Sequence, residues 1–231
     1  MKSVFVTGAS RGMGLEWVRQ YAEAGWRVYA TCRSPGQAEA LKALAGRQPG
    51  ISVHHLDVCD GEQLRNLQIE LEDARIDVLI NNAGVYLDKS TGEFGSIDYE
   101  AWQRTFAVNA MGAVRVSEAF VKQVARSEKR LVVAITSHMG SIAEITAAGN
   151  YAYRSSKAAL NAAMKGLSLA LAERDIGVLL LHPGWVRTGM GGPDAPLTVE
   201  QSVAGMRSLV KNFVPGMSGR FFRYNGTEIP W

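Results

Sequence analysis

Tyr153 and Lys157 stand four residues apart within the run NYAYRSSKAALN, which spans residues 150–161. Ala, Leu, Lys and Arg dominate this run and favour a helix, in which side chains four residues apart lie on one face. A phenol titrates at about pH 10, so it exchanges protons poorly at neutral pH unless a neighbouring cation stabilises the phenolate. We therefore predict that Tyr153 is a general acid/base and that Lys157 lowers its pKa. Tyr151 is the competing phenol, but the residue four positions after it is Ser155.

Short aliphatic and β-branched runs alternate with longer amphipathic segments along the whole chain. We predict strands at residues 3–6, 27–32, 52–56, 77–80, 130–136, 177–182 and within 219–222. Helices are predicted at about 13–24, 37–45, 62–71, 99–126 and 151–174. A further helix opens at TVEQ, residues 198–201, where Thr198 and Gln201 fit a capping box.

Several of the predicted strands, such as DVLI, LVVAI and GVLLL, are apolar throughout. Such runs are typical of a sheet that is covered on both faces. The regular alternation of strand and helix then predicts an α/β fold of the doubly wound Rossmann type, with a parallel sheet and helices on both faces. We expect about seven strands in the order 3-2-1-4-5-6-7, and one domain over residues 1–231.

Glycine-rich or polar loops follow four of the predicted strands: TGASRGMG at 7–14, NNAG at 81–84, TSHMGS at 136–141 and PGWVRT at 183–188. Ligands of doubly wound folds bind beyond the carboxyl ends of the strands, where these loops converge. In the first loop, Gly8 permits a tight turn, Gly12 lets the backbone approach a pyrophosphate, and Gly14 lets the helix lie close to the sheet. A plain structural turn is the alternative, but the flanking strand and helix favour a nucleotide site.

These loops and the Tyr153 region resemble the short-chain dehydrogenase/reductase family over essentially the whole chain. The resemblance rests on TGASRGMG, Asn82-Ala83-Gly84, Asn109 in the long helical region, Ser137 after the fifth strand, YRSSK and PGWVRT. Within the family, the runs YAYRSSKAALN, HPGWVRTGMGGPDAPLT and NGTEIPW are similar to the C-factor-like carbonyl reductase branch. Each motif alone occurs by chance, whereas their order and their places at strand ends make the combination specific.

The resemblance implies roles for four catalytic residues. Tyr153 would protonate a carbonyl oxygen during reduction, or take the hydroxyl proton during oxidation, while hydride passes to or from a nicotinamide ring. Lys157 would also hold the nicotinamide ribose. Ser137 would hydrogen-bond the reacting oxygen, and Asn109 would position a water that links Lys157 to a proton relay.

Two of these assignments have alternatives. Ser137 could instead cap its loop, with Thr136 or Ser141 as the functional hydroxyl. The separation of sixteen residues between Ser137 and Tyr153 is a few longer than the family usually shows, which indicates an insertion. Asn109 could simply be a satisfied side chain within a helix.

The second predicted strand ends at Cys32, and Arg33 directly after it stands where a fold selective for NAD commonly carries an acid for the ribose hydroxyl. Arg11 lies in the glycine loop, so two guanidiniums are available for a 2′-phosphate, with two solvated surface charges as the alternative. We therefore predict NADPH in preference to NADH. By resemblance, Asp57 and Val58 contact the adenine ring. The residues predicted to bind the cofactor are Gly8, Ser10, Arg11, Gly12, Met13, Gly14, Arg33, Asp57, Val58, Asn82, Ala83, Gly84, Tyr153, Lys157, Pro183, Gly184, Val186 and Thr188.

For the substrate we predict an apolar cleft formed by residues that follow three different strand ends: Tyr86, Met139, Trp185 and Met190. Ordinary packing in the core or a loop is the alternative for each of them. A substrate loop at about 185–198 is rich in Gly and Pro, which suggests a mobile entrance and broad specificity. His138, beside Ser137, could touch the substrate, but a solvated loop histidine is the favoured interpretation.

Composition narrows the remaining possibilities. The chain has 231 residues and a net charge of +3 without a block of like charges, which argues against nucleic acid or an anionic membrane as a partner. Cys32 and Cys59 lack the spacing of a metal, redox or disulfide framework, so we expect reduced thiols in a cytoplasmic protein. No apolar run is long enough for a membrane span. The four histidines lack ligand spacing, so no metal is expected.

Together these observations predict an NADPH-dependent oxidoreductase that reduces an aldehyde, ketone or quinone to an alcohol. The alternative is a dinucleotide-binding developmental signalling or regulatory protein, as the C-factor name implies. The fold alone does not establish either function, so the choice depends on the site. The presence of all four catalytic positions favours the enzyme. The resemblance also implies a homodimer or homotetramer built on the helices that carry Asn109 and Tyr153.

Overall fold

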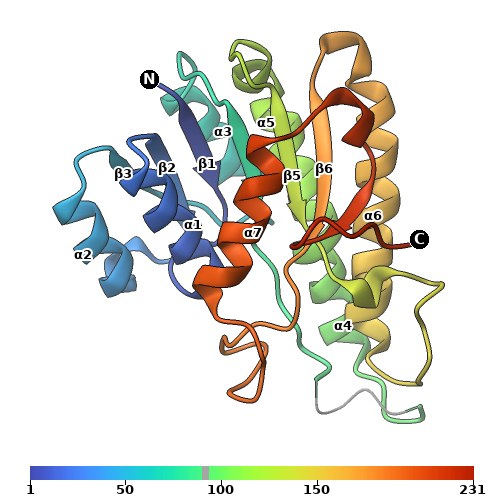
Figure 1. Ribbon diagram of the computed structural model, residues 1–231. Coiled ribbons are helices and arrows are strands. Elements are labelled where there is room, and N and C mark those ends of the chain that lie inside the picture. Colours follow the sequence, from blue (N-terminus) through green and yellow to red (C-terminus); the bar gives the residue numbers. More distant parts are fainter. Residues whose placement is uncertain (90–93) are drawn as a thin grey trace.

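Seven strands form one sheet in the computed structural model, which describes residues 1–89 and 94–231 (Figure 1). The strands are β1 (Ser3–Val6), β2 (Arg27–Cys32), β3 (Ile51–His55), β4 (Val78–Asn81), β5 (Leu131–Ile135), β6 (Gly177–His182) and β7 (Phe221–Arg223). Their order is β3-β2-β1-β4-β5-β6-β7, and all neighbouring strands run parallel. The predicted fold class and strand order are therefore confirmed. The direction of strand addition reverses between β1 and β4, which is where such folds bind ligands.

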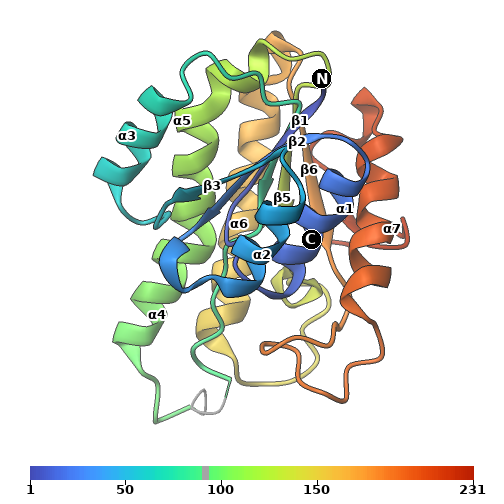
Figure 2. The same cartoon turned by 90° about the vertical axis from the view of Figure 1, so that its left-hand side faces the viewer.

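Helices cover both faces of the sheet, as Figure 2 shows from the side of β3. Helices α1 (Gly12–Glu23), α2 (Glu39–Arg47) and α7 (Val199–Lys211) cover one face, and α3 (Gly61–Glu70), α5 (Ala113–Ala125) and α6 (Tyr151–Ala170) cover the other. Helix α4 (Tyr99–Phe106) lies beyond the end of the sheet, beside α6. No helix in the described ranges is long and apolar enough to cross a membrane.

The two faces of the sheet build two separate cores. Val4 and Val6 of β1 pack with Trp17 of α1, whereas Phe5 packs on the opposite face against Phe120 of α5, with ring centroids 4.5 Å apart. Successive side chains of a strand point to opposite faces, so a strand buried on both sides needs an apolar residue at every position. This explains the uninterrupted apolar runs in the sequence.

The long helical region predicted at 99–126 contains a change of helix type. Helix α4 is followed by a π-helical segment at Ala107–Gly112, and α5 begins directly after it. A π-turn widens the helix by one residue and is frequent at functional sites. Asn109 lies within this segment and is buried.

The start of α7 carries the predicted capping box. The Thr198 hydroxyl accepts from the Gln201 backbone nitrogen at 3.2 Å, and the Gln201 side chain accepts from the Thr198 backbone nitrogen at 3.1 Å. We expect Thr198→Ala to lower the free energy of unfolding by about 1 kcal/mol, because an N–H group of the first turn loses its partner. Urea unfolding measures this change. Thr198→Ser keeps the hydroxyl and should unfold like the wild type. An equal decrease in the free energy of unfolding in both variants would contradict the role of the cap.

Candidate active site

Two loops meet side by side at the switch point of the sheet. Asn82 donates from Nδ2 to the backbone oxygens of Thr7 at 2.9 Å and Gly8 at 3.2 Å. The Thr7 hydroxyl accepts from the backbone nitrogens of Asn82 at 2.9 Å and Ala83 at 3.0 Å. Gly8 has a φ of +66°, and a Cβ atom there would lie 2.9 Å from the Cα atom of Ala83. Glycine is therefore the residue that fits this turn.

The first turn of α1 lies directly against this loop. A Cβ atom at Gly14 would lie 2.1 Å from the Gly8 backbone oxygen and 2.7 Å from the Asn82 side-chain nitrogen. Arg11, the N-cap residue, gives no side-chain hydrogen bond to the first turn. The N–H groups of this turn are thus left without a side-chain cap, which suits the binding of an anion such as a pyrophosphate.

The loops border a cleft with a volume of about 560 Å³, which is within the range of small-molecule sites. Most residues predicted to bind the cofactor line it: Gly8, Ser10, Arg11, Gly12, Met13, Gly14, Arg33, Asp57, Val58, Asn82, Ala83, Gly84 and Thr188. The sequence reasoning missed Cys32, Leu56, Val85, Val108 and Gly189, which also line the cleft. Each of these is the direct sequence neighbour of a predicted residue. Four of them lie at strand ends or in the loops that follow, which give the signal for them, whereas Val108 precedes Asn109 in the π-helical segment.

Five residues predicted to bind the cofactor do not line this cleft: Tyr153 and Lys157 of α6, and Pro183, Gly184 and Val186 after β6. The Pro183 backbone oxygen accepts from the hydroxyl of Ser202 in α7 at 2.7 Å. Gly184 and Val186 contact Leu197: a Cβ atom at Gly184 would lie 2.4 Å from its Cδ1 atom, and Val186 forms an isolated β-bridge with it. Pro183, Gly184 and Val186 therefore shape the loop after β6, from which Thr188 reaches the cleft.

Arg11 and Arg33 are exposed on the rim of the cleft. Neither guanidinium forms an ion pair with a carboxylate within residues 1–89 and 94–231. Asp57, the acidic residue of the lining, accepts from the backbone nitrogen of Cys59 at 2.9 Å. Two unpaired guanidiniums at one rim fit a phosphate group better than a ribose hydroxyl.

Tyr153 and Lys157 lie together on α6 and are almost fully buried, with 7% and 4% of their surface exposed. Lys157 Nζ donates to the Ile135 backbone oxygen at 2.9 Å and lies 5.8 Å from the centroid of the Tyr153 ring. A Cβ atom at Gly84 would lie 3.7 Å from this Nζ and 3.4 Å from Asn109 Oδ1. Residues from three elements therefore meet where the loop after β4 borders the cleft.

Asn109 clamps the loop after β4. Its Oδ1 accepts from the Val85 backbone nitrogen at 2.8 Å, and its Nδ2 donates to the Val85 backbone oxygen at 2.9 Å and to Ser156 Oγ at 3.0 Å. Both amide hydrogens are thereby used within the protein. These contacts support the alternative of a satisfied side chain, and the water-positioning role of Asn109 stays a prediction.

Burial sets the charge of the central pair. It raises the pKa of Tyr153 to about 12, against the opposing effect of a hydrogen bond with Ser137. Burial also lowers the pKa of Lys157 to about 8, because loss of solvation disfavours either charged form. The predicted net lowering of the Tyr153 pKa is therefore wrong: desolvation outweighs any stabilisation of the phenolate by the ammonium group, which donates to Ile135. At neutral pH the phenol keeps its proton.

Of the three candidate hydroxyls after β5, Ser137 is the one that interacts with Tyr153. Thr136 is buried and donates to Asn161 Oδ1 at 2.6 Å, and the Ser141 hydroxyl accepts from the Glu144 backbone nitrogen at 3.2 Å. Ser137 also accepts from the Met139 backbone nitrogen at 3.2 Å, so it caps its loop as well. The geometry favours Ser137 as the donor to a reacting oxygen.

Two of the four residues predicted to line the substrate site contact Tyr153. The Tyr86 ring stacks on the Tyr153 ring, with centroids 4.2 Å apart and planes inclined by 24°. The Tyr153 hydroxyl donates to Met190 Sδ at 3.9 Å, and Met190 also lines the cleft. An aromatic face and a thioether thus lie beside the phenol.

The other two predicted substrate residues lie apart from the cleft lining. Trp185 has 55% of its surface exposed, and its indole N–H donates to the Gly191 backbone oxygen at 2.8 Å. Met139 is half-buried in the short 3₁₀ turn His138–Gly140. For these two residues the contacts favour packing within their loops, and a substrate role stays a prediction.

His138 packs against His182, the last residue of β6. The distance from His138 Nδ1 to His182 Nε2 is 3.3 Å, and the two rings meet at an interplanar angle of 65°. His138 is half-buried, so the prediction of a solvated loop histidine is wrong. The two residues are far apart in sequence, and the adjacent carboxyl ends of β5 and β6 bring them together.

His182 should make stability depend on pH. Burial, followed by the positive charges of His138 and Arg223, lowers the pKa of His182 to about 3, against about 6.5 for an unfolded histidine. Between these values the unfolded chain binds the extra proton, so the free energy of unfolding falls as pH falls, by up to about 1.4 kcal/mol per pH unit. Urea unfolding between about pH 5 and about pH 7 checks this slope. His182→Phe should flatten it, and parallel profiles for the two proteins would contradict the assignment.

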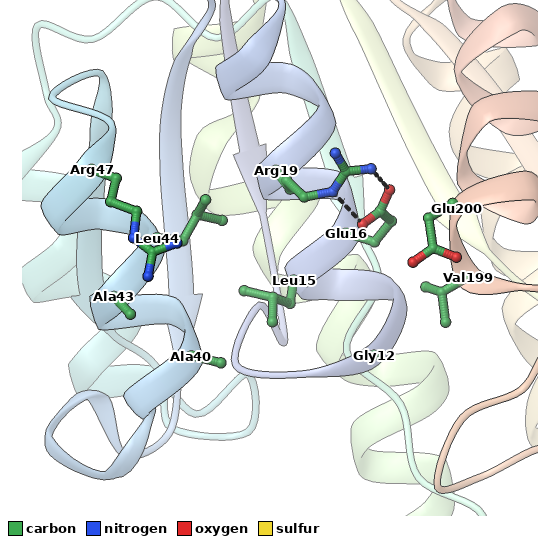
Figure 3. A pocket seen from close by; sticks show the side chains of 10 residues that line it. All are labelled: Gly12, Leu15, Glu16, Arg19, Ala40, Ala43, Leu44, Arg47, Val199 and Glu200. Atoms are coloured by element: carbon green, nitrogen blue, oxygen red, sulfur yellow. Dashed lines mark hydrogen bonds and ion pairs between the residues drawn. The ribbon is translucent and has the colours of Figure 1, made fainter.

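A second cavity, of about 390 Å³, lies between α1, α2 and the start of α7 (Figure 3). Ala40 and Ala43 of α2 leave it open, and Leu15 of α1 points into it. Its buried acid, Glu16, is paired with Arg19, as the dashed lines in Figure 3 mark. The remaining lining is apolar apart from Arg47 and Glu200, and the predicted catalytic residues lie elsewhere.

The family model for short chain dehydrogenases matches residues 2–196. The chain therefore belongs to this family, as its sequence predicts. The C-signal of Myxococcus xanthus is 48% identical over 156 residues, which cover 68% of this chain and 93% of the relative. A 1-hydroxy-2-glutathionyl-2-methyl-3-butene dehydrogenase of Rhodococcus sp. (strain AD45) is 35% identical over 240 residues, with both chains fully covered.

Solved structures agree with this assignment. The carbonyl reductase Sniffer of D. melanogaster has a TM-score of 0.92 and 31% identity, with 100% of both chains covered. The NADPH-bound carbonyl reductase from chicken fatty liver also has a TM-score of 0.92, with 30% identity and coverage of 100% of this chain and 99% of that one. The predicted resemblance to C-factor-like carbonyl reductases is thus confirmed.

Proposed function

We propose that this protein reduces a carbonyl group with NADPH and that Tyr153 donates the proton. The observation that carries the proposal is the position of Tyr153. Its phenol is buried and protonated, interacts with Ser137 and stacks on Tyr86, beside a cleft whose lining suits a dinucleotide. Membership of the short chain dehydrogenases and the similarity to solved carbonyl reductases support carbonyl reduction in general.

The cofactor in this proposal is NADP, as in the similar NADPH-bound carbonyl reductase. The turn at Gly8 and the uncapped first turn of α1 would hold the pyrophosphate, and Arg11 and Arg33 would hold the 2′-phosphate. Lys157 would hold the nicotinamide ribose. Bound NADPH supplies the hydride.

The residues of the chain perform the proton chemistry. Ser137 donates a hydrogen bond to the substrate oxygen and orients it, and Tyr153 transfers its proton to that oxygen as negative charge develops there. The cation of Lys157, one turn away on α6, then stabilises the phenolate that remains. Tyr153 is only 7% exposed, with Tyr86 and Met190 in contact with it, so these charges interact in a medium of low dielectric.

The substrate class follows from the same neighbours. The aromatic face of Tyr86 and the thioether of Met190 favour an aldehyde, ketone or quinone with a hydrophobic substituent. Met190 is 37% exposed within the glycine-rich loop after β6, so one wall of the site is open to solvent. An open wall fits broad specificity.

We also propose a homo-oligomer. Tyr99, Trp102, Phe106 and Met111 line an apolar surface hollow of about 570 Å³ on α4 and the π-helical segment. Tyr99 is 67% exposed and Met111 is 49% exposed, and a contiguous exposed apolar surface of this kind marks a site of protein association. Sedimentation of the purified protein measures its oligomeric state.

A cytoplasmic location likewise remains a proposal, supported by two free cysteines.

The test follows the absorbance of NADPH or NADH in the presence of hydrophobic aldehydes, ketones and quinones. We expect turnover with NADPH on at least one of them and weak or no turnover with NADH. Tight binding of NADPH without turnover on any carbonyl would contradict the proposal. It would favour the second candidate, a dinucleotide-binding signalling protein, for which the similarity to the C-signal of Myxococcus xanthus is the supporting observation.

A further inference from the structure

Helix α6, which carries Tyr153 and Lys157, has no cap of its own. The preceding residue, Asn150, has a left-handed backbone, with φ 55° and ψ 36°, and gives no side-chain hydrogen bond to the helix. Its Oδ1 instead accepts from the Tyr86 hydroxyl at 2.6 Å. The N–H groups of the first turn of α6 therefore need another acceptor.

Asp88 supplies that acceptor from the loop after β4. Its carboxylate accepts from the backbone nitrogen of Ala152 at 2.9 Å and from that of Tyr153 at 3.3 Å. Asp88 is only 6% exposed and forms no ion pair within the described part of the chain. A buried carboxylate without a cation is costly unless hydrogen bonds and the positive end of a helix dipole compensate it. This charge is therefore held in place by α6.

We propose that Asp88 is a positioning residue, whose carboxylate fixes the first turn of α6, and hence Tyr153, against the loop that follows β4. The inference rests on the proposed function of Tyr153 as the proton donor. In addition to that function, Asp88 sets the position of the Tyr153 phenol relative to the cofactor cleft.

Contacts at three places fix the loop after β4 relative to its neighbouring helices. Asn109 holds Val85 through both backbone groups, Tyr86 stacks on the Tyr153 ring, and Asp88 holds the Tyr153 backbone nitrogen. Gly84, immediately before these residues, lines the cofactor cleft. A shift of α6 relative to this loop would thus change the distance between the phenol and any ligand in the cleft. Small misplacements of this kind cost much of the rate of a positioned reaction.

The charge of Asp88 adds an electrostatic effect. The groups that face the phenol are Tyr86 and Asp88 from the loop after β4, Ser137 after β5, Met190 after β6, and Lys157 on α6 itself. Burial chiefly raises the pKa of Tyr153, and Tyr86 and the negative charge of Asp88 raise it further, while Ser137 lowers it. Asp88 therefore favours the protonated phenol, which is the form that reduces a carbonyl and not the form that oxidises an alcohol.

Asp88→Asn tests the proposal, because the amide keeps one acceptor oxygen and loses the charge. We expect kcat for carbonyl reduction to fall about tenfold or more, with KM for NADPH changed less than about twofold. The pH at which alcohol oxidation reaches half its maximum should move down, since the phenolate forms more readily. Asp60→Asn is the matched control: Asp60 caps α3 through two backbone nitrogens, at 2.9 and 3.0 Å, and its loss should leave kcat unchanged.

Two further measurements keep the test decisive. Asp88→Glu retains the charge, so it should restore the pH profile of oxidation and recover part of kcat, and it serves as the test if Asp88→Asn does not fold. Hydrogen exchange of the backbone amides of residues 152 and 153 should become faster in Asp88→Asn, whether or not the protein is a reductase. A wild type without turnover would count against the proposed function alone. Unchanged exchange, or unchanged kcat with unchanged pH dependence, would overturn the role of Asp88.

Discussion

Replacing Tyr153 by Phe is expected to lower kcat for carbonyl reduction by about a thousandfold. General acids of this kind contribute about 10²–10⁴ to a rate, and the burial of Tyr153 limits proton donation by solvent in its place. The substitution removes one oxygen, whose contacts are Ser137 and Met190, and leaves the ring stacked on Tyr86. Binding of NADPH, measured by fluorescence titration, should change less than about twofold, because the ring still fills its place.

Tyr151→Phe provides the matched control. Tyr151 is the other phenol of the same helical turn, and the residue one turn after it is Ser155 instead of a cation. We expect its kcat to stay close to that of the wild type. If Tyr153→Phe retained most of its activity, the proton would have to come from another group, with Ser137 as the nearest hydroxyl, and the proposed role of Tyr153 would be abandoned.

Replacing Arg33 by Glu should raise KM for NADPH by about a hundredfold and leave KM for NADH nearly unchanged or lower. A hydrogen bond between charged groups contributes about 1.5–3 kcal/mol, and the new carboxylate also repels the 2′-phosphate. Because Arg33 is exposed, added salt should screen both effects and narrow the difference between wild type and variant. The ratio of kcat/KM for the two cofactors measures the switch.

Arg47→Glu is the control for this charge reversal. Arg47 is also exposed, at the end of α2, but it lines the separate cavity shown in Figure 3. It should leave the preference for NADPH in place. An equal rise in KM for NADPH in both variants would indicate a general effect of net charge, and the assignment of Arg33 to the 2′-phosphate would be wrong.

The sequence predicts the parts of this protein that depend on local periodicity. Continuous apolar strands indicate a sheet covered on both faces, and the i, i+4 spacing within a helix places Tyr153 and Lys157 on one helix face. The loops at strand ends predict most of the cleft lining, because parallel strands deliver their carboxyl ends to one edge.

Features that depend on burial or on distant contacts could not be predicted in this way. The π-helical segment around Asn109 has the same apolar pattern as an α-helix. The pKa of Tyr153 follows from desolvation, which the neighbouring residues in sequence do not reveal. Asp88 reaches Ala152 across 64 residues without any motif, so its contact with α6 emerges only from the fold.

The cleft collects residues from Gly8 near the start of the chain to Met190 after β6. It therefore exists only once most of the sheet has assembled, and a partly folded chain has no complete dinucleotide site. A ligand that binds only the native state stabilises it by about 2.7 kcal/mol when its concentration is a hundred times its Kd. The rate at which a protease cleaves the transiently opened chain is proportional to the fraction of chains that are open, so a ligand that lowers this fraction slows proteolysis. The supply of dinucleotide would thus govern how long each copy of this protein survives, in addition to how fast it works.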